Sequence, residues 1–375
     1  MKFSECVEIV GSKPSRYQGI KQYVSTGSLD SDHIDENSIE EYAYDDRPSR
    51  ADLVAEAGNV LFAKMAETKK TLVINNQNEK YLFSTGFFAV KPKKNVLTTE
   101  CLYYLLNSNT FLSQKDKYSS GATQKAISNA SLEKIIVNIP CFSKQEDIVK
   151  QLDKLSNIIK KTRKQLLNFD LLIKSRFIEM FGDPVINEKD WDLKTLPELG
   201  EFGRGVSKHR PRNAPELLGG KYPLIQTGDV ANANLYITDY ESTYSEEGFK
   251  QSKMWKAGTL CITIAATIAK TAILTFDSCF PDSVVGFTPN EKTNSLFINY
   301  WFSFFQKILE EQAPAVAQKN INLQVLSELK IITPPISLQN DFATFVQQID
   351  KSKFEIWRYL KFCDIMKRIG FILYD

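Results

Sequence analysis

The sequence predicts an α+β chain in which two homologous mixed α/β domains are joined by two long antiparallel coiled-coil helices, with pseudo-twofold symmetry. Three observations predict this fold: the chain contains two copies of a repeat that is about half its length, a heptad pattern follows each copy, and the composition is typical of globular proteins. We expect the first domain at residues 1–143, the central helix at 144–182, the second domain at 183–336 and the C-terminal helix at 337–375.

The internal repeat is clearest near the end of each copy, where residues 121–148 align without gaps on residues 315–342 at a shift of 194. Eight residue types recur at that shift: Gln124, Lys125, Ile127, Leu132, Pro140, Ser143, Gln145 and Asp147 recur as Gln318, Lys319, Ile321, Leu326, Pro334, Ser337, Gln339 and Asp341. The upstream correspondences are Glu5 with Glu198, Thr26 and Gly27 with Thr227 and Gly228, and the apolar run from Gly58 with the run from Gly258. A duplicated architecture follows, because the matches span whole domains.

Apolar residues after each copy follow steps of three and four, which is the pattern of a coiled-coil helix. The seam residues expected for the helix pair are Ile148, Leu152, Leu155, Ile159, Leu166, Phe169 and Ile173 in the first helix, and Phe342, Val346, Ile349, Ile356 and Leu360 in the second. The helix over 148–180 should be about 50 Å long. The alternative is that each helix lies on the surface of its own domain.

Composition argues against several classes of protein. A formal net charge of +2 restricts any nucleic-acid surface to local patches. Six cysteines without a CxxC pair and only two histidines, His33 and His209, predict no metal site and no nucleophilic catalytic device. We find no phosphate-binding loop motif, and Pro334-Pro335 lacks the flanking residues of an adenine-methyltransferase loop. No apolar stretch reaches membrane-spanning length, which favours a cytoplasmic protein.

Several segments resemble the specificity subunit of type I restriction-modification enzymes, and together they cover essentially the full chain. They are LLIKSRFIEMFGDP (Leu171–Pro184) with Trp191 and Leu196, GGKYPLIQTGDV (Gly219–Val230), the KAGTLCITIAATIAKTAIL stretch from Lys256, and GATQKAI closed by IPCFSKQEDIV. The second copy departs from the family pattern at Ala315–Gln318, where a glycine is usual near the turn.

This resemblance implies a function and partners. Each domain would be a target-recognition domain that reads one half of a split, asymmetric site in double-stranded DNA. The helices would bind two methyltransferase subunits that modify adenine with S-adenosylmethionine, and a restriction subunit with ATP and Mg²⁺ could join. The chain itself would be a non-catalytic subunit with no cofactor.

Loops that combine Lys or Arg with Gln, Asn, Ser or Tyr are the best candidates for DNA contact, because cations bind phosphates and these side chains also bond to base edges. In the first domain they are Lys13, Ser15, Arg16, Tyr17 and Gln18. In the second they are Arg204, Ser207, Lys208, His209, Arg210, Arg212 and Asn213. The repeated pairs Gln124-Lys125 and Gln318-Lys319 come next, and weaker candidates are Arg47, Arg50, Lys64, Lys69 and Lys70. The competing interpretation is a solvated loop, or, for the Gln-Lys pairs, polar residues that hold a turn.

Two alternatives of other classes stay open at this point. One is a coiled-coil interaction scaffold whose duplicated domains bind protein or RNA, and the other is a self-sufficient nuclease or methyltransferase. The charge run Lys160, Lys161, Arg163 and Lys164 is typical of a solvated helix face and could also face methyltransferase subunits or DNA.

Overall fold

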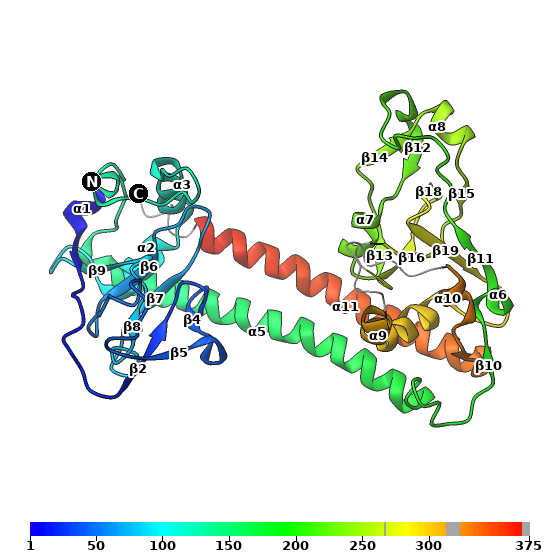
Figure 1. Cartoon of the computed structure of the whole chain (residues 1–375), viewed down its shortest axis with the longest axis horizontal. Coiled ribbons are helices and arrows are strands. Elements are labelled where there is room, and N and C mark those ends of the chain that lie inside the picture. The colour runs from blue at the N-terminus through cyan, green and yellow to red at the C-terminus, as the bar shows by residue number, and fades with distance from the viewer. Residues whose placement is uncertain (266–267, 313–322, 370–375) are drawn as a thin grey trace. The chain divides into compact units, whose positions relative to one another are not determined.

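The computed structural model describes residues 1–265, 268–312 and 323–369. The chain divides into two compact units, each containing its own sheets (Figure 1). Unit 1 consists of Met1–Arg163 with Trp357–Asp375, and unit 2 consists of Lys164–Ile356. The division falls inside both long helices, so it groups residues differently from the four-part division expected from the sequence. No helix among the described residues is long and apolar enough to cross a membrane.

Unit 1 contains a four-stranded antiparallel sheet in the order β1-β9-β6-β7. Its strands are β1 (Val7–Val10), β9 (Phe87–Pro92), β6 (Val60–Ala63) and β7 (Thr71–Val73). A second sheet has the order β5-β2-β8, in which β2 pairs antiparallel with β5 and parallel with β8. Its strands are β5 (Glu40–Ala43), β2 (Ile20–Val24) and β8 (Leu82–Phe83), and a small hairpin joins β3 (Leu29–Asp30) to β4 (His33–Ile34).

Unit 2 repeats both sheets with added edge strands. The larger sheet has the order β11-β19-β16-β17-β13: β11 (Gly200–Arg204), β19 (Val284–Pro289), β16 (Leu260–Thr263), β17 (Thr271–Leu274) and β13 (Tyr236–Ile237). The smaller has the order β14-β12-β18-β15: β14 (Ser242–Tyr244), β12 (Leu218–Leu224), β18 (Ser278–Cys279) and β15 (Met254–Trp255). A separate pair joins β10 (Leu193–Lys194) to β20 (Ile331–Ile332).

The two units share one topology, which confirms the duplication expected from the sequence. Strands β1, β9, β6 and β7 correspond to β11, β19, β16 and β17 in both order and direction. In the smaller sheets, β12 also pairs antiparallel with one neighbour and parallel with the other. The apolar runs after Gly58 and Gly258 become β6 and β16, whose residues are all buried because these strands lie inside the sheets.

Each unit also begins its large sheet after the same short helix. These helices are α1 (Phe3–Cys6) and α6 (Leu196–Leu199). Glu5 accepts a hydrogen bond from the Lys2 backbone N–H at 2.8 Å, and Glu198 accepts one from the Thr195 backbone N–H at 2.7 Å. These carboxylates satisfy N–H groups that a helix start leaves unpaired. The match of Glu5 with Glu198 in the sequence therefore reports a shared helix start.

The remaining short helices lie between the strands or precede the long helices. In unit 1 they are α2 (Thr99–Leu106), α3 (Asn109–Tyr118), α4 (Asn129–Leu132) and the 3₁₀ helix Glu36–Ser38. In unit 2 they are α7 (Thr227–Asn232), α8 (Glu246–Lys250), α9 (Ser295–Gln312), α10 (Leu323–Glu328) and the 3₁₀ helix Pro215–Leu217.

The two long helices are α5 (Phe142–Phe181) and α11 (Ile336–Ile369). Within unit 2 the two helices run antiparallel. Phe177 packs on Phe342 with ring centroids 5.4 Å apart, whereas Asp170, earlier in α5, accepts a 2.6 Å hydrogen bond from the Nζ of Lys353, later in α11. Within unit 1, Arg163 forms a 3.5 Å ion pair with Asp364.

The predicted seam residues divide into two groups. Ile173, Phe342 and Val346 lie in the core of unit 2, where α5 and α11 meet, and Ile349 packs against that core. Ile148 and Leu152 instead lie in the core of unit 1 among residues of the sheet and α2. The first turns of α5 therefore pack on the sheet domain of unit 1. This agrees with the alternative interpretation, in which each helix lies on the surface of its own domain. Of the others, Ile159 is buried, and Leu155, Leu166, Phe169, Ile356 and Leu360 are half-buried.

A buried glutamine fixes the start of each long helix. Gln145 accepts a hydrogen bond from the Thr98 N–H at 2.9 Å and donates to the carbonyls of Val96 and Pro140. Gln339 accepts from Asn294 N–H at 3.1 Å and from the Thr293 hydroxyl, and it donates to the carbonyls of Lys292 and Pro334. Both side chains are fully buried. Each amide therefore ties its long helix to the loop before α2 or α9.

Candidate nucleic-acid interface

The two loops with the predicted DNA-contact residues occupy equivalent places in the fold. Residues 11–19 connect β1 to β2, and residues 205–217 connect β11 to β12. In each unit the loop leaves the first strand of the larger sheet and enters the central strand of the smaller sheet. The common topology therefore brings both groups of basic residues to matching positions.

In the first loop, both cations form ion pairs with the segment that follows β5. Arg16 Nη2 donates to Asp45 Oδ2 at 2.8 Å, and Lys13 Nζ lies 3.4 Å from Asp52 Oδ2. Ser15 and Gln18 are exposed. The Arg16–Asp45 pair is exposed on both sides and therefore weak, so a DNA phosphate can displace Asp45 at little cost.

Aromatic side chains pack within and against the same loop. The Tyr17 hydroxyl donates to the Tyr42 carbonyl at 3.1 Å, and the Tyr17 ring meets the Tyr44 ring edge-on at 5.4 Å. Lys21 Nζ lies 5.2 Å from the centre of the Tyr17 ring. Tyr17 is half-buried, so its main role here is to position the loop, and its pKa is raised chiefly by burial.

Arg47, a weaker candidate from the sequence, is a structural residue. Its guanidinium donates to the carbonyls of Tyr44 and Ala51 and to Asp52 Oδ1 at 3.1 Å. That hydrogen bond is the main cause that lowers the pKa of Asp52. With its donors committed and its side chain 17% exposed, Arg47 shapes the segment that faces the first loop.

The second loop is held at several points. Gln251 Oε1 accepts from the backbone N–H groups of Lys208 and His209 at 2.6 and 2.8 Å. Arg210 and Arg212 both donate to Asp282, one to each carboxylate oxygen. The exposed candidates are Arg204, which is the last residue of β11, and the loop residues Lys208, His209, Arg210, Arg212 and Asn213. Ser207, which the sequence suggested as a DNA contact, is 5% exposed, so its side chain lies inside the loop and is not available at the surface.

The Gln124-Lys125 turn belongs to a different surface of unit 1. Ala66 donates its N–H to the Lys125 carbonyl at 3.0 Å, and Gln124 Nε2 lies 3.5 Å from Met65 Sδ. The turn therefore packs on the β6–β7 connection, while residues 11–19 pack on the segment after β5. Its counterpart, Gln318-Lys319, lies outside the described residues.

Two lysines of the β6–β7 connection also have backbone partners. Lys64 Nζ donates to the Thr85 carbonyl and Lys70 Nζ to the Thr26 carbonyl, both at 2.7 Å. Burial lowers the pKa of Lys64. Both lysines therefore hold neighbouring loops in place.

Sequence reasoning missed the residues that organise the two loops. Asp45, Asp282 and Gln251 carry no local signal, because each lies far along the chain from the loop that it holds. Tyr42 and Tyr44 could have been suspected from the acidic residues that flank them in the segment EEYAYDD.

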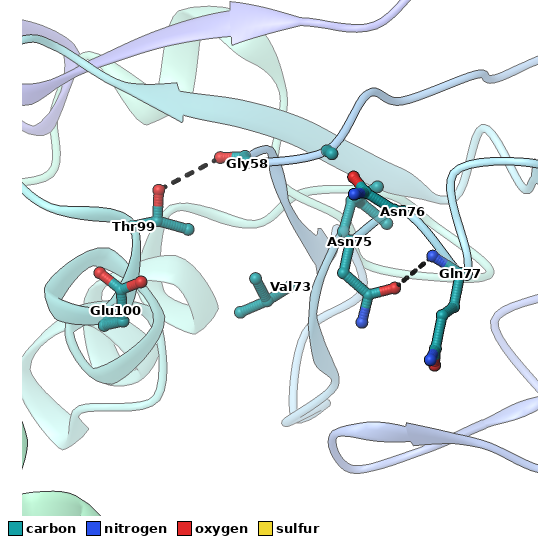
Figure 2. A pocket seen from close by; sticks show the side chains of 9 residues that line it. Gly58, Val73, Asn75, Asn76, Gln77, Thr99 and Glu100 are labelled. Atoms are coloured by element: carbon teal, nitrogen blue, oxygen red, sulfur yellow. Dashed lines mark hydrogen bonds between the residues drawn. The ribbon is translucent and has the colours of Figure 1, made fainter.

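A shallow pocket in unit 1 lies apart from these loops along the chain. Figure 2 shows Gly58, Val73, Asn75, Asn76 and Gln77 on one side and Thr99 with Glu100 on the other. The Thr99 hydroxyl donates to the Gly58 carbonyl at 3.3 Å. Its lining contains no Lys or Arg, so we do not assign it to the nucleic-acid surface.

Comparison with known proteins identifies the family of this chain. A family model described as the type I restriction modification DNA specificity domain matches residues 12–168 and again residues 188–361. A type I restriction enzyme HindI specificity subunit from Haemophilus influenzae is 21% identical over 77% of this chain and 79% of its own length. The MjaIX specificity subunit from Methanocaldococcus jannaschii is 25% identical over 48% of this chain and 43% of its own.

Solved structures show the same fold. A chain described with the complex assembly and conformational transition of the type I R-M system has a TM-score of 0.62 at 17% identity, covering 100% of this chain and 96% of that one. The S subunit of a type I restriction-modification system from M. genitalium has a TM-score of 0.56 at 12% identity, covering 99% and 94%. Because the family model matches both sheet domains and most of the chain, this protein belongs to the type I restriction modification DNA specificity family, whose members recognise DNA sequences.

Proposed function

We propose that this chain is the DNA-reading subunit of a type I restriction-modification complex and that each unit reads one half of a bipartite target. The duplicated topology carries this proposal, because it gives each unit a basic loop at an equivalent position, between the larger sheet and the smaller one. The loops differ in sequence, which suits an asymmetric target whose two halves differ.

The long helices supply the surface for protein partners in this proposal. Large apolar side chains are exposed on α5 within unit 2, including Leu167 at 64% and Leu171 at 62%. On the unit 1 part of α11, Phe362 and Ile365 are also more than half exposed. Exposed apolar side chains gathered on helices are typical of protein interfaces. We infer that two adenine methyltransferase subunits dock on these helices and that restriction subunits join the same assembly.

In this proposal the chain is a non-catalytic cytoplasmic subunit, and the reactions belong to its partners. S-adenosylmethionine would be held by the methyltransferase subunits, and ATP with Mg²⁺ by the restriction subunit. The chain would contribute position and sequence selectivity, through phosphate contacts that give affinity and base contacts that give specificity.

The decisive experiment compares DNA binding by the chain alone and with its methyltransferase subunits, using gel shifts at several salt concentrations. Selective binding of one duplex sequence that depends on the methyltransferase is the expected result. The methylome of cells with and without the gene should then show a split adenine-methylated motif that disappears with the gene. Binding to RNA or to protein without duplex selectivity would favour the interaction scaffold instead.

A further inference from the structure

The two arginines that share Asp282 have different surroundings. Arg210 donates through Nη1 to the carbonyls of Ser207 and His209, at 2.6 and 2.8 Å, and through Nη2 to Asp282 Oδ2 at 3.2 Å. Its guanidinium closes the loop onto the turn between β18 and β19. Arg210 is therefore occupied in holding the loop together.

Arg212 donates through Nη2 to Asp282 Oδ1. Among the residues that the structure describes, its other N–H groups have no acceptor, and its side chain is 43% exposed. A guanidinium carries five N–H donors in a rigid planar fork, and a bidentate contact uses only one edge of that fork. Arg212 can therefore keep its bond to Asp282 and still offer a second edge to an outside acceptor.

The backbone around Arg212 is fixed on both sides. Gln251 holds the N–H groups of Lys208 and His209, and the Ser252 hydroxyl donates to the Val206 carbonyl at 2.8 Å. After Arg212, the side chains of Ala214 and Leu217 are buried. A side chain on so constrained a loop, with one edge held by a carboxylate, loses little further freedom on binding.

We propose that Arg212 is the base-reading arginine of unit 2, that Asp282 is its positioning residue, and that the half-site read by unit 2 contains a guanine contacted by Arg212. This inference rests on the proposed function. Guanine presents two acceptors, O6 and N7, in the major groove, and they match the spacing of two guanidinium N–H groups. Asp282 neutralises one of two arginine charges, so the loop stays attractive to DNA.

The test uses the full chain with its methyltransferase subunits and maps methylated sites over a randomised duplex library. Arg212→Ala should relax one position of one half-site by about tenfold or more and leave the other half-site unchanged. Arg212→Lys keeps the charge and loses the planar fork, so it should relax the same position. The variant is expected to fold, because Asp282 keeps its bond to Arg210.

Asp282→Asn tests the positioning role. It should relax the same position as Arg212→Ala, by a smaller factor, because the asparagine no longer holds the guanidinium by charge. The matched control is Lys256→Ala, which removes a different ion pair of unit 2, the 2.7 Å contact between Lys256 and Asp277. The control should leave the recognised sequence unchanged.

Two outcomes overturn the inference. If Arg212 contacts a phosphate, Arg212→Ala weakens binding to all sequences evenly and reduces the salt slope of the affinity by about one, while Arg212→Lys behaves like the wild type. If the arginine is merely solvated, none of the variants changes the motif. In both cases the wild-type complex still methylates a bipartite site, whereas failure of the proposed function would remove sequence-selective methylation from the wild type itself.

Discussion

Unit 1 and unit 2 share their strand order, but they differ in the helices that follow the larger sheet. In unit 1, α2 ends at Leu106 and α3 begins at Asn109, whereas in unit 2 the single helix α9 runs from Ser295 to Gln312. The Ser108 side chain accepts from the Phe111 N–H at 3.2 Å and so caps a new helix. The corresponding stretch of α9, YWFSFF, is rich in aromatic residues that pack on α5 and α11.

A further difference concerns a buried lysine. Lys115 on α3 is 1% exposed, and its Nζ donates to the carbonyls of Met65 and Thr68 at 2.6 and 2.8 Å. It holds the β6–β7 connection against α3, and so depends on the helix break that unit 2 lacks. The comparison teaches that the strands and the glutamine at the helix start are the common framework, while the connections were free to diverge.

The common framework is tested most strongly at the two glutamines. Gln145→Leu and Gln339→Leu should each lower the free energy of unfolding of their unit by about 3 kcal/mol, because several buried polar groups lose their partners. Hydrogen exchange measures the stability of each unit separately, because the amides of the two units are followed individually. The matched controls, Gln165→Leu on α5 and Gln347→Leu on α11, replace exposed glutamines and should change little. A large effect at only one buried glutamine would contradict the equivalence.

The lysine tests a feature of unit 1 alone. Lys115→Met should lower the stability of unit 1 by about 2 kcal/mol, because the carbonyls of Met65 and Thr68 lose their donor inside the protein. Hydrogen exchange of the β6–β7 connection should speed up, and that of unit 2 should not. An unchanged exchange rate at residues 64–70 would show that the lysine does not hold this connection.

The same residue gives a pH prediction. Burial lowers the pKa of Lys115 below its usual 10.5, with a smaller opposing effect from Asp116. Between its folded pKa and 10.5 the unfolded chain binds the proton and the folded chain does not, so stability rises with pH in this window. The advantage of the wild type over Lys115→Met, measured as the difference in melting temperature, should therefore grow as the pH rises through this window toward 10.5. A constant or shrinking advantage would contradict the lowered pKa.

The helix break gives a smaller effect. Ser108→Ala removes the cap of α3 and should cost unit 1 about 1 kcal/mol. Its counterpart for comparison is Ser303→Ala on α9, where the hydroxyl donates to the Tyr300 carbonyl within a continuous helix at 2.6 Å. That change should be nearly neutral, because a helix interior needs no cap. Equal costs in thermal unfolding would show that the break in unit 1 has another cause.

The exposed ion pair of the first basic loop should matter least for stability. Arg16 and Asp45 are 77% and 70% exposed, so Arg16→Ala should leave the melting temperature of unit 1 unchanged within error. The same variant should weaken DNA binding at low salt if the first loop contacts phosphate. A clear loss of stability would mean that this pair is part of the framework and not a replaceable surface contact.

Much of this framework could be predicted from the sequence. The shift of 194 that aligns Gln145 with Gln339 identified residues with the same hydrogen-bonding role, and Glu5 with Glu198 marked equivalent helix starts. The heptads predicted both long helices. They did not predict that Ile148 and Leu152 pack on a sheet domain, because an apolar stripe specifies a buried face without specifying what buries it.

The sequence by itself determined the duplication, the two long helices and the two basic loops, because repeats, heptads and helix starts are written in residues that lie close together along the chain. Only the tertiary structure decided which carboxylate pairs with each of the loop cations Lys13, Arg16, Arg210 and Arg212. Arg210 and Arg212 both bind Asp282, which is 70 positions away from Arg212 in the chain. Strand pairing between β11 and β19 brings such distant residues together, and no local pattern records it.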